Sequence, residues 1–339
     1  ESIGYGAHLI REGLADVVIA GGSEASIHPL PIAGFASMQA LSTRNDSPET
    51  ASRPYDTDRD GFLLGEGGAI LVLESEEHAR ARDARIICEL AGFGVSADSH
   101  HIAAPEPEGA GASRAMADAV RDAGATPADV CHINAHATST PVGDVAEVAA
   151  IRRAFGADAD HMAISGTKSM TGHLLGAAGA LEAVFAVQAV RDRVAPPTIN
   201  IDNLDPAVDL DIVRDQPRQL AADGDLLVLD NSFGFGGHNV ALAFEPGGVD
   251  LHVLYAGGEL CSWSTRSGKL LRRVPLQSVP EAGLTLLRAV GERELLLAGP
   301  GGDVGRWEAD TGRRVRAHGA ARAEGAHRGG RVSQRRDVA

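Results

Sequence analysis

Along the first 246 residues, segments whose apolar residues have the spacing of a helix alternate with segments that have the pattern of a strand. Apolar residues three or four positions apart predict helices, and short apolar runs bounded by Gly or polar turns predict strands. The predicted helices cover residues 3–14, 76–83, 113–123, 144–155 and 174–192. The predicted strands cover residues 16–20, 69–74, 85–91, 130–134, 163–165, 226–229 and 240–244, the last two as an antiparallel pair. This order predicts a layered mixed α/β fold.

Two of these helices carry informative residues. Ser113 stands at the position of an N-cap, and Gly124 follows the end of the same helix. The stretch 174–190 is the most apolar of the chain, but Glu182 and Gln188 interrupt it. It is therefore too short and too polar to predict a membrane span, and Glu182 requires a buried partner.

A change of composition predicts a domain boundary near residue 246. Residues 247–339 contain 15 Lys and Arg against 10 Asp and Glu, a net charge of +5, whereas the preceding residues have a net charge of −20. The change coincides with the sequence EPGG at 245–248, which is typical of a linker. We expect one domain over residues 1–246 and a second segment after it.

Composition excludes several functions. The chain of 339 residues has a net charge of −15 and a pI near 5.3, which disfavours nucleic acid and a polybasic membrane anchor. Aromatic residues make up 4%, so the core must consist of Ala, Val, Leu and Ile. Cys88, Cys131 and Cys261 lie far apart, which predicts neither a disulfide framework nor a metal cluster and favours the reducing cytoplasm.

Three polar loops could carry chemistry. Residues 134–140 read NAHATST directly after a predicted strand, so that a rigid scaffold presents His136. His173 precedes the long apolar helix, where unpaired N–H groups favour a neutral imidazole that can donate to an oxyanion. Taken alone, a histidine such as His136 more often merely caps a loop, and Lys168 could be an ordinary surface lysine.

The third loop, NSFGFGGHN at residues 231–239, is rich in glycine. Its three glycines allow close approach of backbone N–H groups to an anion. A phosphate loop of the Walker type is excluded, because no Gly-Lys-Ser or Gly-Lys-Thr follows.

Taken together, the three loops resemble the signatures of beta-ketoacyl-acyl carrier protein synthases, condensing enzymes of type II. The resemblance rests on NAHATSTPVGD at 134–144, GTKSMTGHLLGAAG at 166–179 and NSFGFGGHN at 231–239, supported by LSTRND at 41–46, RPYD at 53–56, RDGF at 59–62 and PPTIN at 196–200. It runs through essentially all of residues 1–246. It implies a thiolase-like layered sandwich and an acyltransferase, a 3-oxoacyl-acyl carrier protein synthase of fatty acid or polyketide biosynthesis.

The resemblance also implies the site. His136 and His173 would flank the malonyl thioester carbonyl and stabilise the enolate formed by decarboxylation, and His136 would also assist attack on the carboxylate or its release as bicarbonate. Lys168, Asp144, Glu147 and Glu182 correspond to a buried charged network that orients the histidines. Thr138 and Thr140 match the hydroxyls that hold the phosphopantetheine arm, and Phe235 matches the gate residue whose N–H belongs to the oxyanion hole, with Phe233 beside it.

The implied partners are an acyl carrier protein, malonyl and acyl thioesters, and a second copy of the chain in a homodimer. No bound cofactor and no metal is expected, because phosphopantetheine arrives on the carrier protein. No nucleic-acid partner is expected.

The sequence departs from the family pattern in two ways. Ala137 replaces the Gly that often follows the first His, a small change. The nucleophilic Cys of the family, within an A-C-x-S/T-G turn before the first helix, has no counterpart, and Cys88, Cys131 and Cys261 lie elsewhere. We therefore expect an N-terminally truncated synthase domain.

Two alternative functions remain open. One is a non-catalytic synthase-like partner subunit, and the other is an interaction protein that acts through its tail. A thiolase is disfavoured, because His238 and Asn239 stand where a second Cys is expected.

The segment 247–318 resembles blades of a WD-repeat propeller. Short predicted strands at 254–258 and 295–300 are each followed by a Trp and a polar turn, and Trp263 and Trp307 lie 44 residues apart. Coincidence between two hairpins is the alternative. Residues 319–339 are rich in Ala, Gly and Arg with few apolar anchors, which predicts disorder.

A truncated sandwich would leave apolar surface uncovered. We expect an unpaired sheet face near residues 1–20 and exposure of the apolar helix 174–192.

Overall fold

The computed structural model describes residues 1–220 and 226–247 with their side chains, and the backbone of the strands between residues 250 and 318. The chain divides between Gly247 and Gly248 into two compact units. No described helix has the length and the apolar character that a membrane crossing requires.

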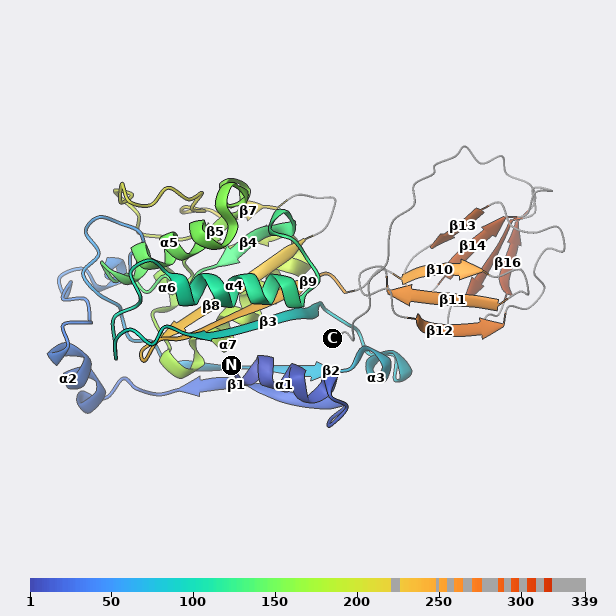
Figure 1. Cartoon of the computed structure of the whole chain (residues 1–339), viewed down its shortest axis with the longest axis horizontal. Coiled ribbons are helices and arrows are strands. Elements are labelled where there is room, and N and C mark those ends of the chain that lie inside the picture. The colour runs from blue at the N-terminus through green and yellow to red at the C-terminus, as the bar shows by residue number, and fades with distance from the viewer. Residues whose placement is uncertain are drawn as a thin grey trace. The chain divides into compact units, whose positions relative to one another are not determined.

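The first unit is organised around a five-stranded mixed sheet in the order β3-β9-β8-β4-β5 (Figure 1). Its strands are β3 (Glu89–Ala97), β4 (Val130–Asn134), β5 (Ala163–Ser165), β8 (Leu227–Gly234) and β9 (His238–Glu245). Strand β4 runs parallel to both β5 and β8, whereas β9 runs antiparallel to β8 and β3. The parallel arrangement brings the carboxyl ends of β4, β5 and β8, and the polar loops that follow β4 and β5, to one edge of the sheet.

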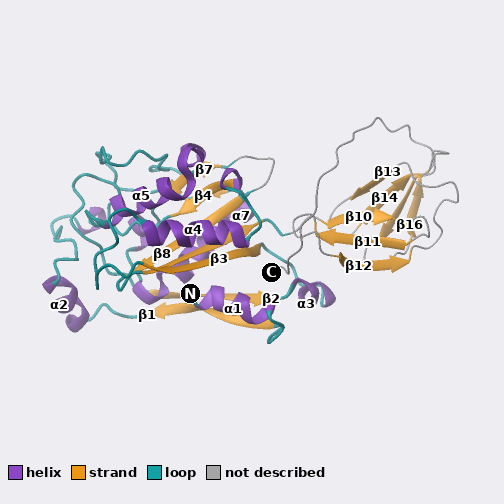
Figure 2. Ribbon diagram, viewed as in Figure 1, coloured by secondary structure: helices purple, strands orange, loops and turns teal. Residues whose placement is uncertain are grey.

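Helices separate this sheet from a second, smaller one (Figure 2). Helices α4 (Ala110–Asp122) and α5 (Gly143–Phe155) pack together, and α4 covers β3 and β9. Helices α1 (Ser2–Arg11) and α7 (Ala178–Asp192) contact the five-stranded sheet and also the antiparallel pair β1 (Val17–Glu24) and β2 (Gly67–Glu74). The layered thiolase-like arrangement inferred from sequence is thus the observed one.

The remaining elements of the first unit are short. They are the helices α2 (Pro29–Ser37), α3 (Glu76–Ala81) and α6 (Lys168–Thr171), the 3-10 turns η1 (Pro48–Thr50), η2 (Pro127–Asp129), η3 (Gly156–His161) and η4 (Leu175–Ala177), and the paired strands β6 (Val194–Ala195) and β7 (Arg218–Gln219).

Small aliphatic residues build the core on both faces of the five-stranded sheet. One cluster joins α4 and α5 to the sheet through residues such as Met116, Ile133 and Ile151. The other joins α1, α7 and the β1–β2 pair through Ile3, Ala183 and Val228. Eight alanines of α4 and α7 are buried, and alanine lets helices lie close to a sheet: Ala112, Ala115, Ala119, Ala178, Ala180, Ala183, Ala186 and Ala189.

Several local features differ from the sequence-based expectation. The strand predicted at 85–91 begins at Glu89 and continues to Ala97, because residues 85–88 form a loop. Helix α4 begins three residues before Ser113, and Gly109, in the left-handed conformation at φ +62°, is its N-cap. Helix α2, which has no buried residue, was not predicted, since it lacks a polar face and so has no amphipathic period.

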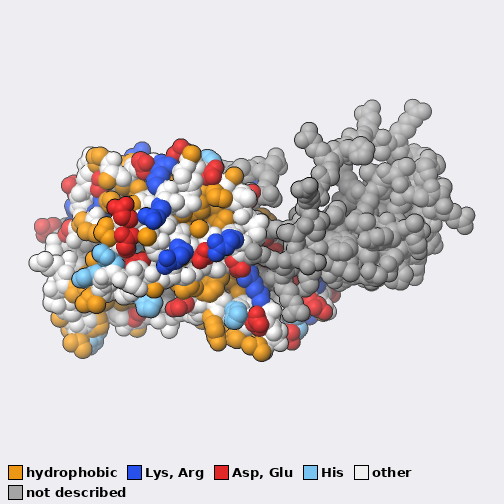
Figure 3. Space-filling view, viewed as in Figure 1, with side chains coloured by type: hydrophobic (Ala, Val, Ile, Leu, Met, Phe, Trp, Pro, Cys, Tyr) orange, Lys and Arg blue, Asp and Glu red, His pale blue; other side chains and the backbone are white. Residues whose placement is uncertain are grey.

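The expected uncovered sheet face is present. In the β1–β2 pair, Ile19 lies opposite Val72, and the two side chains are 72% and 61% exposed. Helix α7 is not exposed, however, because strands β1 and β2 contact it and so do β8 and β9 of the five-stranded sheet. Uncovered apolar residues lie instead on β1, β2 and α2, and hydrophobic atoms are visible on the surface at the α2 end of the unit (Figure 3).

The second unit contains two antiparallel sheets of consecutive strands. One has β10 (Asp250–Leu254), β11 (Glu259–Ser264) and β12 (Leu270–Pro275), and the other has β13 (Leu286–Ala289), β14 (Glu294–Ala298), β15 (Val304–Glu308) and β16 (Arg314–His318). Trp263 lies in β11 and Trp307 in β15, so both lie within strands. The tail predicted to be disordered, 319–339, lies outside the described residues.

Candidate active site

The segment that follows β4 is fixed by a buried carboxylate. Glu147 of α5 accepts hydrogen bonds from the backbone N–H groups of His136 (2.9 Å) and Ala137 (2.8 Å). Asn231 of β8 donates to the same carboxylate at 3.1 Å. Burial raises the pKa of Glu147, and these donors oppose that rise. Glu147 thus sets the position of His136 through its backbone.

His173 is held by the backbone of a neighbouring loop. Its N–H donates to the Leu63 carbonyl at 2.7 Å, and its carbonyl accepts from the Gly65 N–H at 3.0 Å. The ring atom Nδ1 accepts a hydrogen bond from the Leu175 N–H at 3.2 Å. Since Nδ1 is the acceptor, the neutral ring carries its proton on Nε2, which is therefore a donor.

The structure brings the two histidine rings together. The ring centroids of His136 and His173 lie 5.3 Å apart, with the ring planes at 85°. Burial, and then the charge of Lys168, lowers the pKa of His173 to about 3. Burial also lowers the pKa of His136 well below its usual value, with further contributions from Lys168 and His173. Both imidazoles are therefore neutral at pH 7.

Aromatic rings enclose this pair. Phe62 meets the His173 ring edge to face at 5.3 Å, and Phe233 lies 6.0 Å from the His136 ring. Phe235 lies in the turn between β8 and β9, is half exposed, and its ring centroid is 6.4 Å from that of Phe35. The turn needs the two glycines that follow Phe235, because Gly236 and Gly237 adopt φ values of +84° and +76°.

Lys168 and Glu182 form a buried ion pair. The Lys168 ammonium donates to both carboxylate oxygens of Glu182, at 2.7 and 2.6 Å, and the two side chains are 1% and 2% exposed. The Thr167 hydroxyl bonds Glu182 at 3.0 Å. Glu182 therefore has the buried partner that its place in an apolar helix requires.

Asp144 is separate from that pair. Its carboxylate accepts from the backbone N–H groups of Tyr55 (3.0 Å) and Ser139 (3.1 Å), and it lies 3.3 Å from Arg59 Nε. Burial raises the pKa of Asp144 to about 6. Asp144 thus fixes the loop of Thr138 and Thr140, whose hydroxyl oxygens are 3.1 Å apart.

A cavity of about 140 Å³ lies between the amino ends of α1 and α7. Asp230 of β8 lines it, together with Ser232 and Gly179. The Asp230 carboxyl is buried, its Oδ1 atom has no hydrogen-bond partner, and burial raises its pKa well above the usual value. Among the described residues, no group of three or more His, Cys, Asp or Glu side chains could hold a metal ion.

The sequence matches two domains of one family. Residues 2–79 match the beta-ketoacyl synthase N-terminal domain, and residues 87–202 match the beta-ketoacyl synthase C-terminal domain. These residues belong to the beta-ketoacyl synthase family.

Named relatives agree with these synthase domains. The chain is 54% identical over 244 residues to a 3-oxoacyl-[acyl-carrier-protein] synthase 2 of Synechocystis sp. and 53% identical to the protein of that name from Coxiella burnetii. Each alignment covers 72% of this chain and 58% of the relative. The chain thus spans somewhat more than half the length of these curated relatives.

Solved structures of ketosynthases share the fold of the synthase domains. A beta-ketoacyl synthase from Burkholderia phymatum is 41% identical with a TM-score of 0.68, and the match covers 72% of this chain and 58% of that one. A type II polyketide ketosynthase, solved with its acyl-carrier protein, is 36% identical with a TM-score of 0.69, covering 72% and 59%.

Some residues of the synthase site were not singled out from the sequence. In the sequence Asn231 is one residue of a glycine-rich loop, yet in the structure it donates a hydrogen bond from β8 to Glu147 of α5. Arg59 is one residue of the motif RDGF, yet it lies beside Asp144. In both cases the sequence shows a polar residue inside a motif of the family. It does not show the hydrogen-bond or ion-pair partner, which lies more than 80 positions away along the chain.

Neither described cysteine of the synthase domains has the surroundings of a nucleophile. Burial raises the pKa of Cys88 and of Cys131 to about 12. We expect both thiols to react with iodoacetamide at pH 7.5 about a thousandfold more slowly than in the urea-unfolded chain, because only the thiolate reacts. Peptide mapping by mass spectrometry measures both rates. Labelling of the folded chain at the unfolded rate would contradict this expectation.

Proposed function

We propose that this site carries out the decarboxylation half of the 3-oxoacyl-acyl carrier protein synthase reaction on a malonyl thioester. The observation that carries the proposal is the pair of neutral imidazoles, with His173 presenting an Nε2 proton beside the His136 ring. A neutral imidazole N–H can donate a hydrogen bond to a developing oxyanion and so stabilise its charge, while the imidazole keeps its proton.

The chemistry follows from this pair. The bond between the malonyl α-carbon and its carboxylate breaks, carbon dioxide leaves, and the electron pair moves into the thioester enolate. Hydrogen bonds from His173 Nε2 and from His136 stabilise the enolate oxygen. Water then protonates the carbanion. Where an acyl thioester is held on a Cys, the carbanion would attack it instead, with Phe235 contributing its N–H to the acyl oxyanion hole.

Charged residues around the pair support this assignment. Lys168 and Glu182 are buried together next to the histidines, and burial, followed by the positive charge of Lys168, lowers the pKa of both rings. Glu147 and Asp144 hold the backbone of the loop that bears His136. All four residues therefore act as positioning groups in the proposal.

The substrate is proposed to arrive on an acyl carrier protein. The Thr138 and Thr140 hydroxyls would bind the amides of the phosphopantetheine arm, and no separate cofactor is then needed. One structural relative was solved with its acyl-carrier protein, which supports this partner. The synthase family assignment also supports a homodimer in the cytoplasm and a role in fatty acid or polyketide synthesis.

For the second unit we propose WD-repeat-like blades. The four consecutive antiparallel strands β13–β16 support this reading, because a propeller blade is a sheet of four strands.

A non-catalytic partner subunit is the second candidate. It is favoured by the high thiol pKa of Cys88 and Cys131, which leaves neither as a carrier of the acyl group. Two of the structural relatives are ketosynthases solved with a chain length factor. Under this reading the chain would bind malonyl thioester without decarboxylating it.

The test uses the full chain and malonyl-pantetheine. We expect the chain to release carbon dioxide and to form acetyl-pantetheine faster than the spontaneous reaction in buffer. Chromatography measures the acetyl-pantetheine formed. Binding without turnover would support the partner subunit, and absence of both would overturn the proposed function.

A further inference from the structure

The loop that bears Thr138 and Thr140 is under backbone strain. Ala137 and Ser139 adopt φ values of +32° and +69°, which side chains of L-residues rarely do. Such conformations are unfavourable for L-residues and persist only where their surroundings hold them. The groups that hold residues 137–141 therefore determine where the two threonine hydroxyls lie.

One arginine supplies several of those groups. Arg59 Nε donates to the Thr140 carbonyl at 3.1 Å, and its Nη2 donates to the Pro141 carbonyl at 2.9 Å. Its Nη1 donates to the Asp56 carbonyl at 2.7 Å and to the Asp205 carboxylate at 2.8 Å. The side chain is 3% exposed. Arg59 thus connects the threonine loop to two other segments of the chain.

Asp144 completes this connection. It lies 3.3 Å from Arg59 Nε and accepts the Ser139 N–H at 3.1 Å. The two residues after Thr138 are thus held by groups that meet at Arg59: Ser139 through Asp144, and Thr140 directly. A planar guanidinium can serve several acceptors at fixed angles, which an ammonium cannot.

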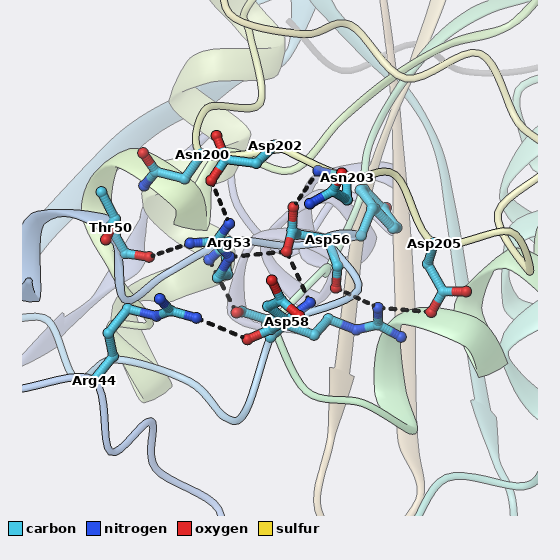
Figure 4. Close-up of polar contacts among 12 residues, drawn as sticks. Arg44, Thr50, Arg53, Asp56, Asp58, Asn200, Asp202, Asn203 and Asp205 are labelled. Carbon is cyan, nitrogen blue, oxygen red and sulfur yellow. Dashed lines mark hydrogen bonds and ion pairs between the residues drawn. The ribbon is translucent and has the colours of Figure 1, made fainter.

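A second buried arginine in the same region provides a comparison. Figure 4 shows Arg53 directed toward Asp56, Asp202 and the Thr50 carbonyl. Its side chain is 4% exposed, as buried as that of Arg59. The guanidinium of Arg53 makes none of the described hydrogen bonds to residues 137–141; only its backbone N–H does, to the Ser139 hydroxyl.

We propose that Arg59 is a positioning residue that sets the Thr138–Thr140 hydroxyl pair for the pantetheine arm, with Asp144 as its buried counter-ion. This inference rests on the proposed function for the identity of the ligand. The placement of the loop by Arg59 does not depend on that function and can be measured separately.

The matched variants are Arg59→Lys and Arg53→Lys, which keep the charge and remove a guanidinium of equal burial. With malonyl-pantetheine as the probe, we expect Arg59→Lys to raise KM about tenfold and to leave kcat within about threefold, because the hydroxyls bind the arm and not the reacting carbons. Arg53→Lys should change KM by less than about twofold, since its guanidinium does not hold the loop.

Amide hydrogen exchange provides the second readout. The Ser139 N–H bonds Asp144, and the Gly143 and Asp144 N–H groups bond Thr140. In Arg59→Lys these amides should exchange at least about tenfold faster than in Arg53→Lys. Equal exchange in the two variants, or an equal rise of KM in both, would overturn the inference. If the unmodified chain neither binds nor decarboxylates the probe, the proposed function fails, and hydrogen exchange alone decides the role of Arg59.

Discussion

Replacing Lys168 by Met is expected to lower the free energy of unfolding by about 4 kcal/mol, because it leaves the Glu182 carboxylate buried without its counter-charge. The ammonium is the only cation bonded to Glu182 in the described structure, and both side chains are almost fully buried. Urea denaturation followed by circular dichroism at 222 nm measures the effect. That signal reports the first unit, since all the described helices lie within residues 1–247.

Two further variants separate charge from volume. Lys168→Met combined with Glu182→Leu removes both charges and should recover at least about half of the loss, because no uncompensated ion remains. Arg191→Met, in the exposed pair Arg191–Asp192, should cost less than about 1 kcal/mol. A double variant as unstable as Lys168→Met alone would show that packing, and not the unpaired charge, causes the loss.

Elements with a clear hydrophobic period could be predicted from the sequence. Strands β4 and β5 were predicted with their observed bounds, because short apolar runs lie between polar turns. The start of β3 was missed, since the apolar residues 86–88 continue into the strand although they lie in a loop. Helix α2 was missed because its exposed apolar residues carry no polar face from which a period could be recognised.

For the site, residue types could be predicted but pairings could not. The buried position of Glu182 followed from its place in an apolar helix, whereas its partner could have been any cation. Asp144 and Lys168 were assigned to one network by resemblance. In the structure, Asp144 pairs with Arg59 and Lys168 with Glu182, because α5 and α7 pack on opposite faces of the five-stranded sheet.

His173→Phe is expected to reduce decarboxylation of malonyl-pantetheine about 10²- to 10³-fold, because it removes the Nε2 donor that the enolate oxygen would accept from. The control His161→Phe changes an exposed histidine outside the site and should leave the rate unchanged. Unfolding of both variants in urea checks that the loss is not one of folding. A rate within about threefold of the unmodified chain would show that His173 is not the donor.

The pH profile tests the protonation state independently. With a pKa of about 3, the His173 ring stays neutral as the pH falls from 8 to 5, so it should contribute no step to the rate over that range. A step near pH 6 that persists in His173→Phe would belong to Asp144, whose pKa is about 6. Only near pH 3 would protonation place an N–H on Nδ1 against the Leu175 N–H, break that hydrogen bond and displace the ring. If the imidazolium were the working form, the rate would instead rise as the pH fell through about 6.5, the unperturbed value for histidine. A titration step between about pH 6 and 7 that disappears in His173→Phe would therefore contradict the neutral-donor mechanism, whereas a flat profile distinguishes it from catalysis by a charged histidine.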